Sequence, residues 1–226
     1  MKRRLKLLLA LPKNTWLRFI TYLPGELAFS LRRRYWKSRL KKMGENVRID
    51  TGVFFQNPQY ITIEDNSWID KNVHILAGPD KSSRQRQFMP NPNFKLNKGE
   101  VFIGKNIHIA PFCIISGIGG VYISDNCGIS AYAKLYSFSN YYRDRRDSAN
   151  PEYYFSCAAD PVKQYMLEGP IFIAENVGIG LNVTIMPGVS ILKNSFITIN
   201  SVVMRSFKEN TLIGGNPAHK MGNRFE

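Results

Sequence analysis

The most regular stretch of the chain is residues 169–221, GPIFIAENVGIGLNVTIMPGVSILKNSFITINSVVMRSFKENTLIGGNPAHKM. An aliphatic residue recurs there every six positions, and a small or branched residue stands two places before each one. The aliphatic positions are Ile173, Ile179, Ile185, Ile191, Ile197 and Val203. Neither the helical period of 3.6 residues nor two-residue alternation produces a strict period of six. A hexapeptide repeat does, and it predicts a parallel β-helix in which three hexads form one coil.

The same frame recurs upstream in three blocks, and each block supplies three aliphatic residues. These are Ile63, Ile69 and Ile75, then Ile103, Ile109 and Ile115, then Ile123, Ile129 and Leu135. The third residue after a frame position is often asparagine, as at Asn66, Asn72, Asn106, Asn126, Asn176, Asn182, Asn194 and Asn200. Asparagine tolerates the left-handed conformation that a sharp corner needs. The pattern therefore predicts a triangular coil with aliphatic residues inside and asparagines at the corners.

The frame is interrupted three times. It slips by two residues at Gly119-Gly120, where we expect a bulge, and it breaks at residues 79–99 and 140–169. The first insertion is polar and basic, has no period of its own, and reads as a loop. The second carries five tyrosines and three arginines. It is either a loop that packs on its own coil or a substrate wall, because aromatic rings stack on sugars and arginines bind phosphates.

Residues 1–44 differ from the repeats. They begin with a basic end and an apolar run that is too short to span a bilayer. A basic amphipathic helix follows over residues 16–42, which we expect to break near Pro24-Gly25. Its basic residues are Arg32, Arg33, Arg34, Lys37, Arg39, Lys41 and Lys42. One interpretation is a cap on the open end of the β-helix with a solvated basic face. The other adds contact with an anionic membrane surface.

The overall composition limits the partners and the cellular compartment that we expect for this protein. The formal net charge of +14 indicates anionic partners, among which nucleic acid, nucleotide cofactors and anionic lipid all qualify. Cys113 and Cys127 fall in the inward column of the repeat, and Cys157 lies in the second insertion. An odd number of cysteines without paired spacing argues against a zinc site and for a reducing compartment. We therefore expect a cytoplasmic protein, with the inner face of the cell membrane as an alternative location.

Three motifs near the C-terminus carry a resemblance to a known family. They are VGIGLNVTIMPGVSI (177–191), NSVVMRS (200–206) and GGNPAHK (214–220). In this order they resemble the hexapeptide-repeat acyltransferases, such as the galactoside and maltose O-acetyltransferases and the acetyltransferases of bacterial polysaccharide clusters. The resemblance implies an all-β fold, a left-handed parallel β-helix over residues 45–221 with 222–226 as a tail. It also implies a homotrimer with active sites between subunits, acetyl-CoA as donor, and no metal.

The family's coenzyme contacts, carried onto the matching positions, fall on Gly180, Leu181, Ile199, Met204, Arg205, His219 and Lys220. Part of this set has a direct physical reason. Coenzyme A carries three phosphates, and basic side chains bind phosphate through charge-assisted hydrogen bonds. The resemblance therefore implies that Arg205, His219 and Lys220 meet the phosphates.

The chain departs from the family at the general base. In the sugar O-acetyltransferases a histidine follows a strand ending Ile-Tyr-Thr, and Asn140 or Tyr141 occupies that place here. Neither is a good base at neutral pH, although either can orient an acceptor by hydrogen bonding. His108 points outward beside Gly128 and Gly178 of the next two coils, so it borders a strip without side chains. We predict His108 as the base, with a carboxylate such as Asp144 as the next candidate.

The leading hypothesis is an acetyl-CoA-dependent O-acetyltransferase that acts on a sugar hydroxyl of a surface polysaccharide or its lipid-linked precursor. One alternative is N-acylation of an amino sugar nucleotide. Another is a β-helix scaffold without catalytic activity, which the missing histidine motivates. We expect coenzyme A, a carbohydrate acceptor and two further copies of the chain as partners, and no nucleic acid.

Overall fold

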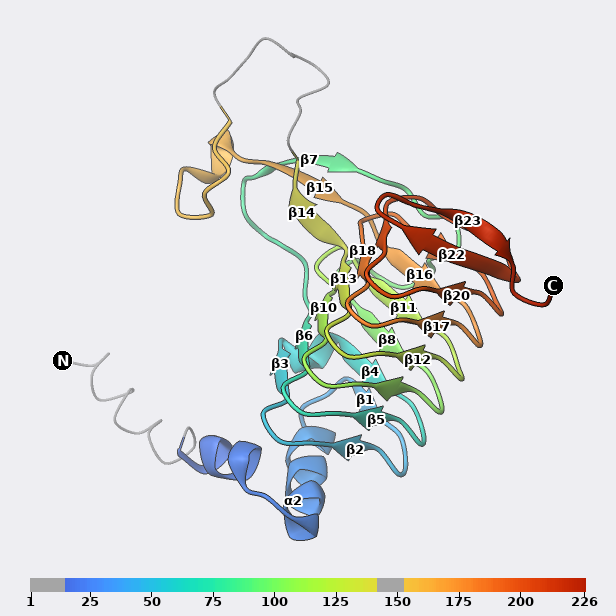
Figure 1. The fold of residues 1–226 in the computed structure, drawn as a ribbon. Helices are drawn as coiled ribbons and strands as arrows, with labels where there is room; N and C mark the ends of the chain where they lie inside the picture. Colours follow the sequence, from blue (N-terminus) through green and yellow to red (C-terminus); the bar gives the residue numbers. More distant parts are fainter. Residues whose placement is uncertain (1–14, 142–152) are drawn as a thin grey trace.

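The computed structural model describes residues 15–141 and 153–226. Short strands stack into parallel coils that rise from the N-terminal helices to a C-terminal hairpin (Figure 1). The fold class predicted from the repeat, a parallel β-helix of hexapeptides, is confirmed. Each coil contributes one strand to each of three faces. A fourth, smaller sheet lies beside the coils.

The strands of each face pair in register from coil to coil. The first face contains β1 (Lys42–Met43), β4 (Ile61–Ile63), β8 (Val101–Ile103), β11 (Val121–Ile123), β16 (Ile171–Ile173) and β19 (Ser190–Ile191). The second contains β2 (Arg48–Ile49), β5 (Trp68–Ile69), β9 (His108–Ile109), β12 (Gly128–Ile129), β17 (Gly178–Ile179), β20 (Phe196–Ile197), β22 (Thr211–Gly215) and β23 (Ala218–Asn223). The third contains β3 (Phe54–Gln56), β6 (His74–Leu76), β10 (Ile114–Ser116), β13 (Lys134–Tyr136), β18 (Thr184–Ile185) and β21 (Val202–Val203).

The predicted frame residues form the core. All of them are at most 1% exposed, and those of one face lie directly above one another, as with Ile63, Ile103 and Ile123. Cys113 and Cys127, each two residues before a frame position, are buried as well. Burial raises the pKa of each of these two thiols to about 11, so both stay protonated at neutral pH.

The predicted corner asparagines adopt the left-handed conformation, with φ between 55° and 60°. Their side chains also form ladders along the stack, for example from Asn106 Nδ2 to Asn126 Oδ1 at 2.9 Å. Phe112 and Tyr132 occupy two equivalent corners with φ of 63° and 62°. Their rings stack on each other at a centroid distance of 5.1 Å.

All three interruptions of the repeat leave the stack at the same corner, between the third face and the first. The expected bulge at Gly119-Gly120 is wrong. Residues 117–120 instead make a longer turn, closed by a hydrogen bond from Gly120 N to Gly117 O of 2.9 Å, and β11 keeps its register. Two extra residues fit a corner more easily than a strand, because a corner has no ladder to maintain.

The two long insertions pair with each other. The first was expected to be a loop, but it contains β7 (Gln85–Phe88), which pairs in parallel with β15 (Tyr165–Glu168) of the second. β14 (Phe138–Asn140) pairs with β15 in antiparallel fashion and completes the insertion sheet, which projects beside the coils in Figure 1. Short 3-10 turns lie at Pro58–Tyr60 and Pro161–Lys163.

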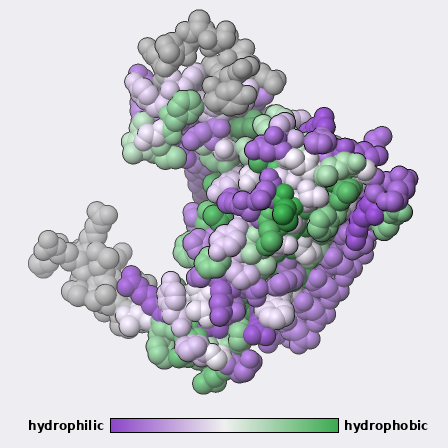
Figure 2. All heavy atoms as spheres, viewed as in Figure 1, coloured by the Kyte–Doolittle hydropathy of each residue, from purple (hydrophilic) through white to green (hydrophobic). Residues whose placement is uncertain are grey.

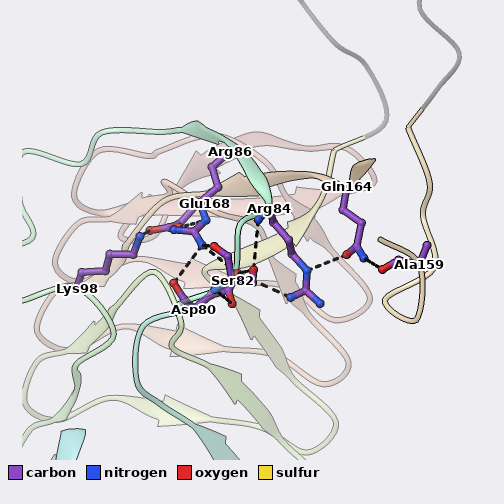
Figure 3. A network of polar contacts seen from close by, with 8 residues as sticks. All are labelled: Asp80, Ser82, Arg84, Arg86, Lys98, Ala159, Gln164 and Glu168. Atoms are coloured by element: carbon purple, nitrogen blue, oxygen red, sulfur yellow. Dashed lines mark hydrogen bonds and ion pairs between the residues drawn. The ribbon is translucent and has the colours of Figure 1, made fainter. Parts of the chain in front are cut away.

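A buried carboxylate joins the insertions (Figure 3). Glu168 is 1% exposed, and its oxygens lie 2.7 Å from Lys98 Nζ and 3.6 Å from Arg86 Nε. Arg86 also bonds Asp80 Oδ2 at 3.1 Å, and Arg84 Nε donates to Gln164 Oε1 at 2.7 Å. Burial alone would raise the pKa of Asp80, but hydrogen bonds from Ser82 and the charges of Arg86 and Arg84 lower it.

The N-terminal helices pack on the first coil. The predicted break at Pro24-Gly25 is confirmed, since residues 15–22 are helical and α2 spans Glu26–Lys37. The expectation that Arg32 belongs to a solvated basic face is wrong. Arg32 is 1% exposed and donates to the carbonyl oxygens of Ile49 at 2.8 Å, Ile20 at 3.0 Å and Leu23 at 2.8 Å. Trp36 and Leu40 join the core of the coils.

Two expected boundaries shift. The first coil begins at Lys42 rather than after residue 44, because β1 pairs with β4. The last strand, β23, runs to Asn223 and takes in part of the expected tail, since it folds back on β22. In the part of the chain that the structure describes, no helix combines the length and apolar character needed to cross a bilayer.

Candidate active site

A column of outward side chains on the second face contains the candidate site. In register along this face stand Arg48, Trp68, His108, Gly128, Gly178 and Phe196. A Cβ atom added to Gly128 would meet nothing within 4 Å. One added to Gly178 would lie 2.5 Å from the ring of Phe196. The open gap in the column therefore lies over Gly128, with His108 on one side and Phe196 on the other.

This gap is part of an open groove with a volume of about 420 Å³. It is lined by His108, Ala110, Gly128, Ile129, Ser130, Ala131, Gly178, Ile179, Leu181 and Phe196. The groove thus brings together the predicted base, both glycines of the predicted strip and one of the predicted coenzyme contacts. Its walls are mainly backbone and small or apolar side chains, which suits a ligand that lies flat along the coils.

His108 has a carboxylate partner. Its Nε2 atom lies 2.9 Å from Asp70 Oδ2, and its half-exposed ring lies beside Trp68 at 5.4 Å between centroids. In the neutral tautomer that this contact favours, Nε2–H donates to Asp70 and Nδ1 keeps its lone pair. The arrangement holds an imidazole with an available nitrogen at the edge of the groove, which is what a general base requires.

Asp70 was not among the predicted site residues. The first insertion separates it from His108 in the sequence, so their proximity is hidden by the numbering. A signal was nevertheless present, because aligning the hexads places Trp68 directly beneath His108. Asp70 then falls at the corner just beyond that strand.

The predicted coenzyme contacts fall into two groups. Leu181 and Ile199 are exposed on successive corners, where Asn200 N donates to Leu181 O at 2.9 Å. Gly180 lies beside them, with no room for a side chain, because a Cβ atom would stand 2.7 Å from Ile197 O. In β23, His219 and Lys220 pair with Gly214 and Ile213 of β22.

Met204 and Arg205 form the second group. They lie beyond β21, at the next corner of the same coil, and both are exposed. The guanidinium of Arg205 lies 5.5 Å from the ring centroid of Phe207. A ligand that contacts both groups has to cross the outward surface of β21.

Asn140 and Tyr141 do not line the groove of His108. Both belong to the insertion sheet or its edge, where Asn140 Nδ2 donates to Phe155 O at 3.4 Å and Tyr141 packs on Tyr165 at 5.5 Å. Asp144, the reserve candidate for the base, lies outside the described residues. His74 is exposed on β6 and packs against Phe54 at 5.7 Å, away from the groove. Within residues 15–141 and 153–226, no group of three or more His, Cys, Asp or Glu side chains is placed to hold a metal ion.

The known proteins that this chain resembles are named as acyltransferases or acetyltransferases. No model of a known protein family matches the chain. A dTDP-4-amino-4,6-dideoxy-D-glucose acyltransferase from Escherichia coli is 30% identical over 185 residues, which is 81% of this chain and 82% of the relative. The structure of a mutant of AntD, an N-acyltransferase from Bacillus cereus, in complex with dTDP and coenzyme A superimposes with a TM-score of 0.68 at 21% identity, covering 85% of this chain and 89% of AntD. A hexapeptide-repeat acetyltransferase from Vibrio cholerae in complex with acetyl-coenzyme A gives 0.54 at 20% identity, covering 91% and 81%.

Proposed function

The chain belongs to the hexapeptide-repeat acyltransferases, and from that premise we propose that it transfers an acyl group from acyl-CoA to a sugar at the groove of His108. The observation that carries this proposal is the His108–Asp70 pair, at 2.9 Å, beside the open backbone of Gly128. A base at the edge of a gap without side chains gives a thioester and an acceptor room to meet at an imidazole nitrogen.

The reaction follows from these groups. The acceptor nitrogen or oxygen attacks the thioester carbonyl while Nδ1 of His108 takes its proton, and Asp70 stabilises the imidazolium through Nε2–H. Backbone N–H groups of the groove stabilise the oxyanion of the tetrahedral intermediate. The carbon–sulfur bond then breaks, and the departing sulfur takes the proton back from His108. Acyl product and free coenzyme A thiol leave, so no covalent enzyme intermediate is needed.

The donor is assigned to the side of the groove that carries Leu181. From there the pantetheine arm follows the corner of Leu181 and Ile199, and the phosphates meet the basic residues Arg205, His219 and Lys220. Lys220→Glu places an anion beside these phosphates. It should weaken coenzyme A binding more than acceptor binding, and the difference should shrink with salt. Equal losses for both ligands would contradict the assignment.

For the acceptor, we favour the amine of a nucleotide-linked amino sugar. The E. coli relative is named for such a substrate and matches most of this chain. This choice reverses the order of the two acceptor hypotheses drawn from the sequence. The second candidate is the hydroxyl of a surface-polysaccharide sugar or its lipid-linked precursor. The exposed aromatic side chains of helix 15–22 favour it, because they suit a protein that works at a membrane.

We also propose that the working form is a homotrimer, with the β-helix domain flanked by the N-terminal cap. One copy offers an open groove, and closed cyclic symmetry is the usual way for identical chains to complete such sites. Sedimentation equilibrium should give three times the 25.9 kDa mass of the chain. A stable, fully active monomer would contradict the trimer.

The decisive test combines acetyl-CoA with a panel of acceptors: a dTDP-linked amino sugar, its hydroxyl analogue, free sugars and a lipid-linked sugar. Release of coenzyme A thiol and the product mass are both measured. Gly128→Val should abolish transfer by filling the gap, whereas Gly222→Val also meets open space, lies outside the groove and should not. If no acceptor is acylated and coenzyme A does not bind, the scaffold hypothesis is correct instead.

A further inference from the structure

The positive charge of this protein is concentrated at one end. Residues 1–42 contain thirteen lysines and arginines and a single acid, Glu26, so they carry +12 of the net charge of +14. The remaining coils and insertions are close to neutral. An anionic partner therefore meets the molecule first at the end where the N-terminal helices lie.

Ion pairs within the fold neutralise part of this charge. Arg33 and Lys37 pair with Glu45, Lys41 pairs with Glu100, and Lys42 pairs with Glu64, while Arg32 is buried. Within residues 15–42, Arg18, Arg34 and Arg39 are exposed and make no ion pair. The sequence of residues 1–14 adds five further basic residues and no acid.

Large apolar side chains are exposed on the same two helices as Arg18 and Arg34. Trp16 and Phe19 stack on each other at 5.7 Å and are 50% and 54% exposed, and Tyr22 and Leu27 are 66% and 71% exposed. We call these four residues the N-terminal apolar surface. Hydrophobic residues show over the N-terminal helices at the lower end of the molecule in Figure 2. Helical spacing explains the grouping, because Trp16, Phe19 and Tyr22 are three residues apart and so lie along one side of the helix.

An apolar cleft adjoins this surface. It has a volume of about 410 Å³ and lies between helix 15–22, α2 and the first coil, lined among others by Leu17, Tyr22, Trp36, Phe54 and Phe55. Tyr22 belongs to both the cleft and the N-terminal apolar surface. Apolar contact area thus continues inward from the surface.

We propose that the N-terminal apolar surface docks on an anionic phospholipid membrane, with Trp16 and Phe19 at the level of the headgroups and the basic residues facing the lipid phosphates. Aromatic side chains concentrate at the membrane interface, and basic residues beside them add attraction to anionic lipid. Nucleic acid would use the charge but would leave the four apolar side chains without a role. The proposal stands independently of which acceptor is acylated.

The test uses the full chain, because Ile20, Arg32 and Trp36 are buried against the first coil and truncation would expose its core. Vesicles of neutral phosphatidylcholine and vesicles with about a third phosphatidylglycerol are floated with the protein. The wild type should bind the anionic vesicles, less strongly at high salt. Trp16→Ser/Phe19→Ser should lower partitioning at least about tenfold. The control Phe155→Ser/Phe225→Ser removes two rings that are 60% and 66% exposed elsewhere and should bind like the wild type.

Brominated lipids supply a second readout, since Trp16 fluorescence should be quenched and Trp16→Phe should lose most of that quenching. Failure of the wild type to bind, or equal binding by Trp16→Ser/Phe19→Ser, would overturn the proposal. Two other results would overturn it by naming another occupant. Binding of a DNA oligonucleotide that survives Trp16→Ser/Phe19→Ser would assign the surface to a polyanion. A change of oligomeric state in that variant would assign it to a second copy of the chain.

Discussion

The coils of the β-helix pair through parallel strands, whereas the insertion sheet combines one parallel pair with one antiparallel pair, and different forces hold the two regions. In the coils, the turns bury aliphatic residues in register, and asparagine ladders link many of the corners. In the insertion sheet, the buried group is instead a carboxylate, Glu168, which pairs with Lys98 and Arg86. The coils are therefore encoded by a local repeat. The insertion sheet depends on charges that meet only after two segments 80 residues apart have come together.

The largest stability effect should come from the core of the coils. Ile115→Ala removes a fully buried side chain and should lower the free energy of unfolding by about 2–5 kcal/mol. Ile199→Ala makes the same chemical change at a residue that is 60% exposed, and should cost within about 0.5 kcal/mol. Urea denaturation measures both. Similar losses at the two positions would show that the repeat does not define the core.

A smaller and local effect should follow from Glu168→Gln. The variant leaves Lys98 and Arg86 without their buried anion, at an expected cost of about 1–3 kcal/mol. Hydrogen exchange should accelerate in β7 and β15 and stay unchanged in β12 and β17. Glu209→Gln, which removes an exposed pair with Lys193, is the matched control and should change neither. Uniform acceleration in coils and insertion sheet would contradict two separately held regions.

At two corners of the coils, Phe112 and Tyr132 adopt the left-handed conformation that asparagine adopts at the other corners. Replacing both with asparagine should stabilise the protein. The double variant Phe112→Asn/Tyr132→Asn relieves two left-handed corners, each worth about 1 kcal/mol, and loses one ring stack worth about 1 kcal/mol. A net gain of about 1 kcal/mol is expected in the unfolding free energy. A loss of stability would mean that the stacked rings contribute more than the strain costs.

The smallest expected effect is a loss of stability of the insertion sheet at low pH. The pKa of Asp80 is lowered in the folded state, so its stabilising contribution is complete above the ordinary value of 3.8 and is lost as the pH falls through the folded value. The insertion sheet should loosen below about pH 3.8, and Asp80→Asn should reduce this pH dependence. Exchange rates of β7, corrected for their intrinsic dependence on pH, are the measurement. An unchanged acid response in Asp80→Asn would exclude this carboxylate as the cause.

The features that the sequence predicted correctly are those that depend on the six-residue repeat. The frame isoleucines, the corner asparagines and the outward direction of His108 all follow from it, because each depends only on position within a hexad. The pairing of β7 with β15 could not be predicted, since neither strand has a period and their contact is a tertiary event. Arg32 was misassigned for a related reason. Arg32 is buried because three backbone carbonyl oxygens converge on its guanidinium, and no local sequence pattern predicts that convergence.

The candidate site also combines residues that the repeat predicts with residues that only the tertiary structure brings together. Gly128, Gly178 and His108 share a column that the repeat alone specifies. Asp70 completes the pair with His108 from a coil that precedes the first insertion, where reading along the chain does not place it. Asn140 and Tyr141 were chosen by the family's spacing, and the second insertion carries them into the insertion sheet instead.

The central claim is that His108 removes the acceptor proton, and its most direct test is the pH dependence of kcat in His108→Asn once an acceptor is known. The variant should lower kcat by about 10²–10⁴-fold, and the pH–rate profile should lose the limb that reports the general base. Coenzyme A affinity should stay near the wild-type value, because the residues proposed to bind its phosphates are unchanged in this variant. An active His108→Asn enzyme with an unchanged pH profile would contradict the claim.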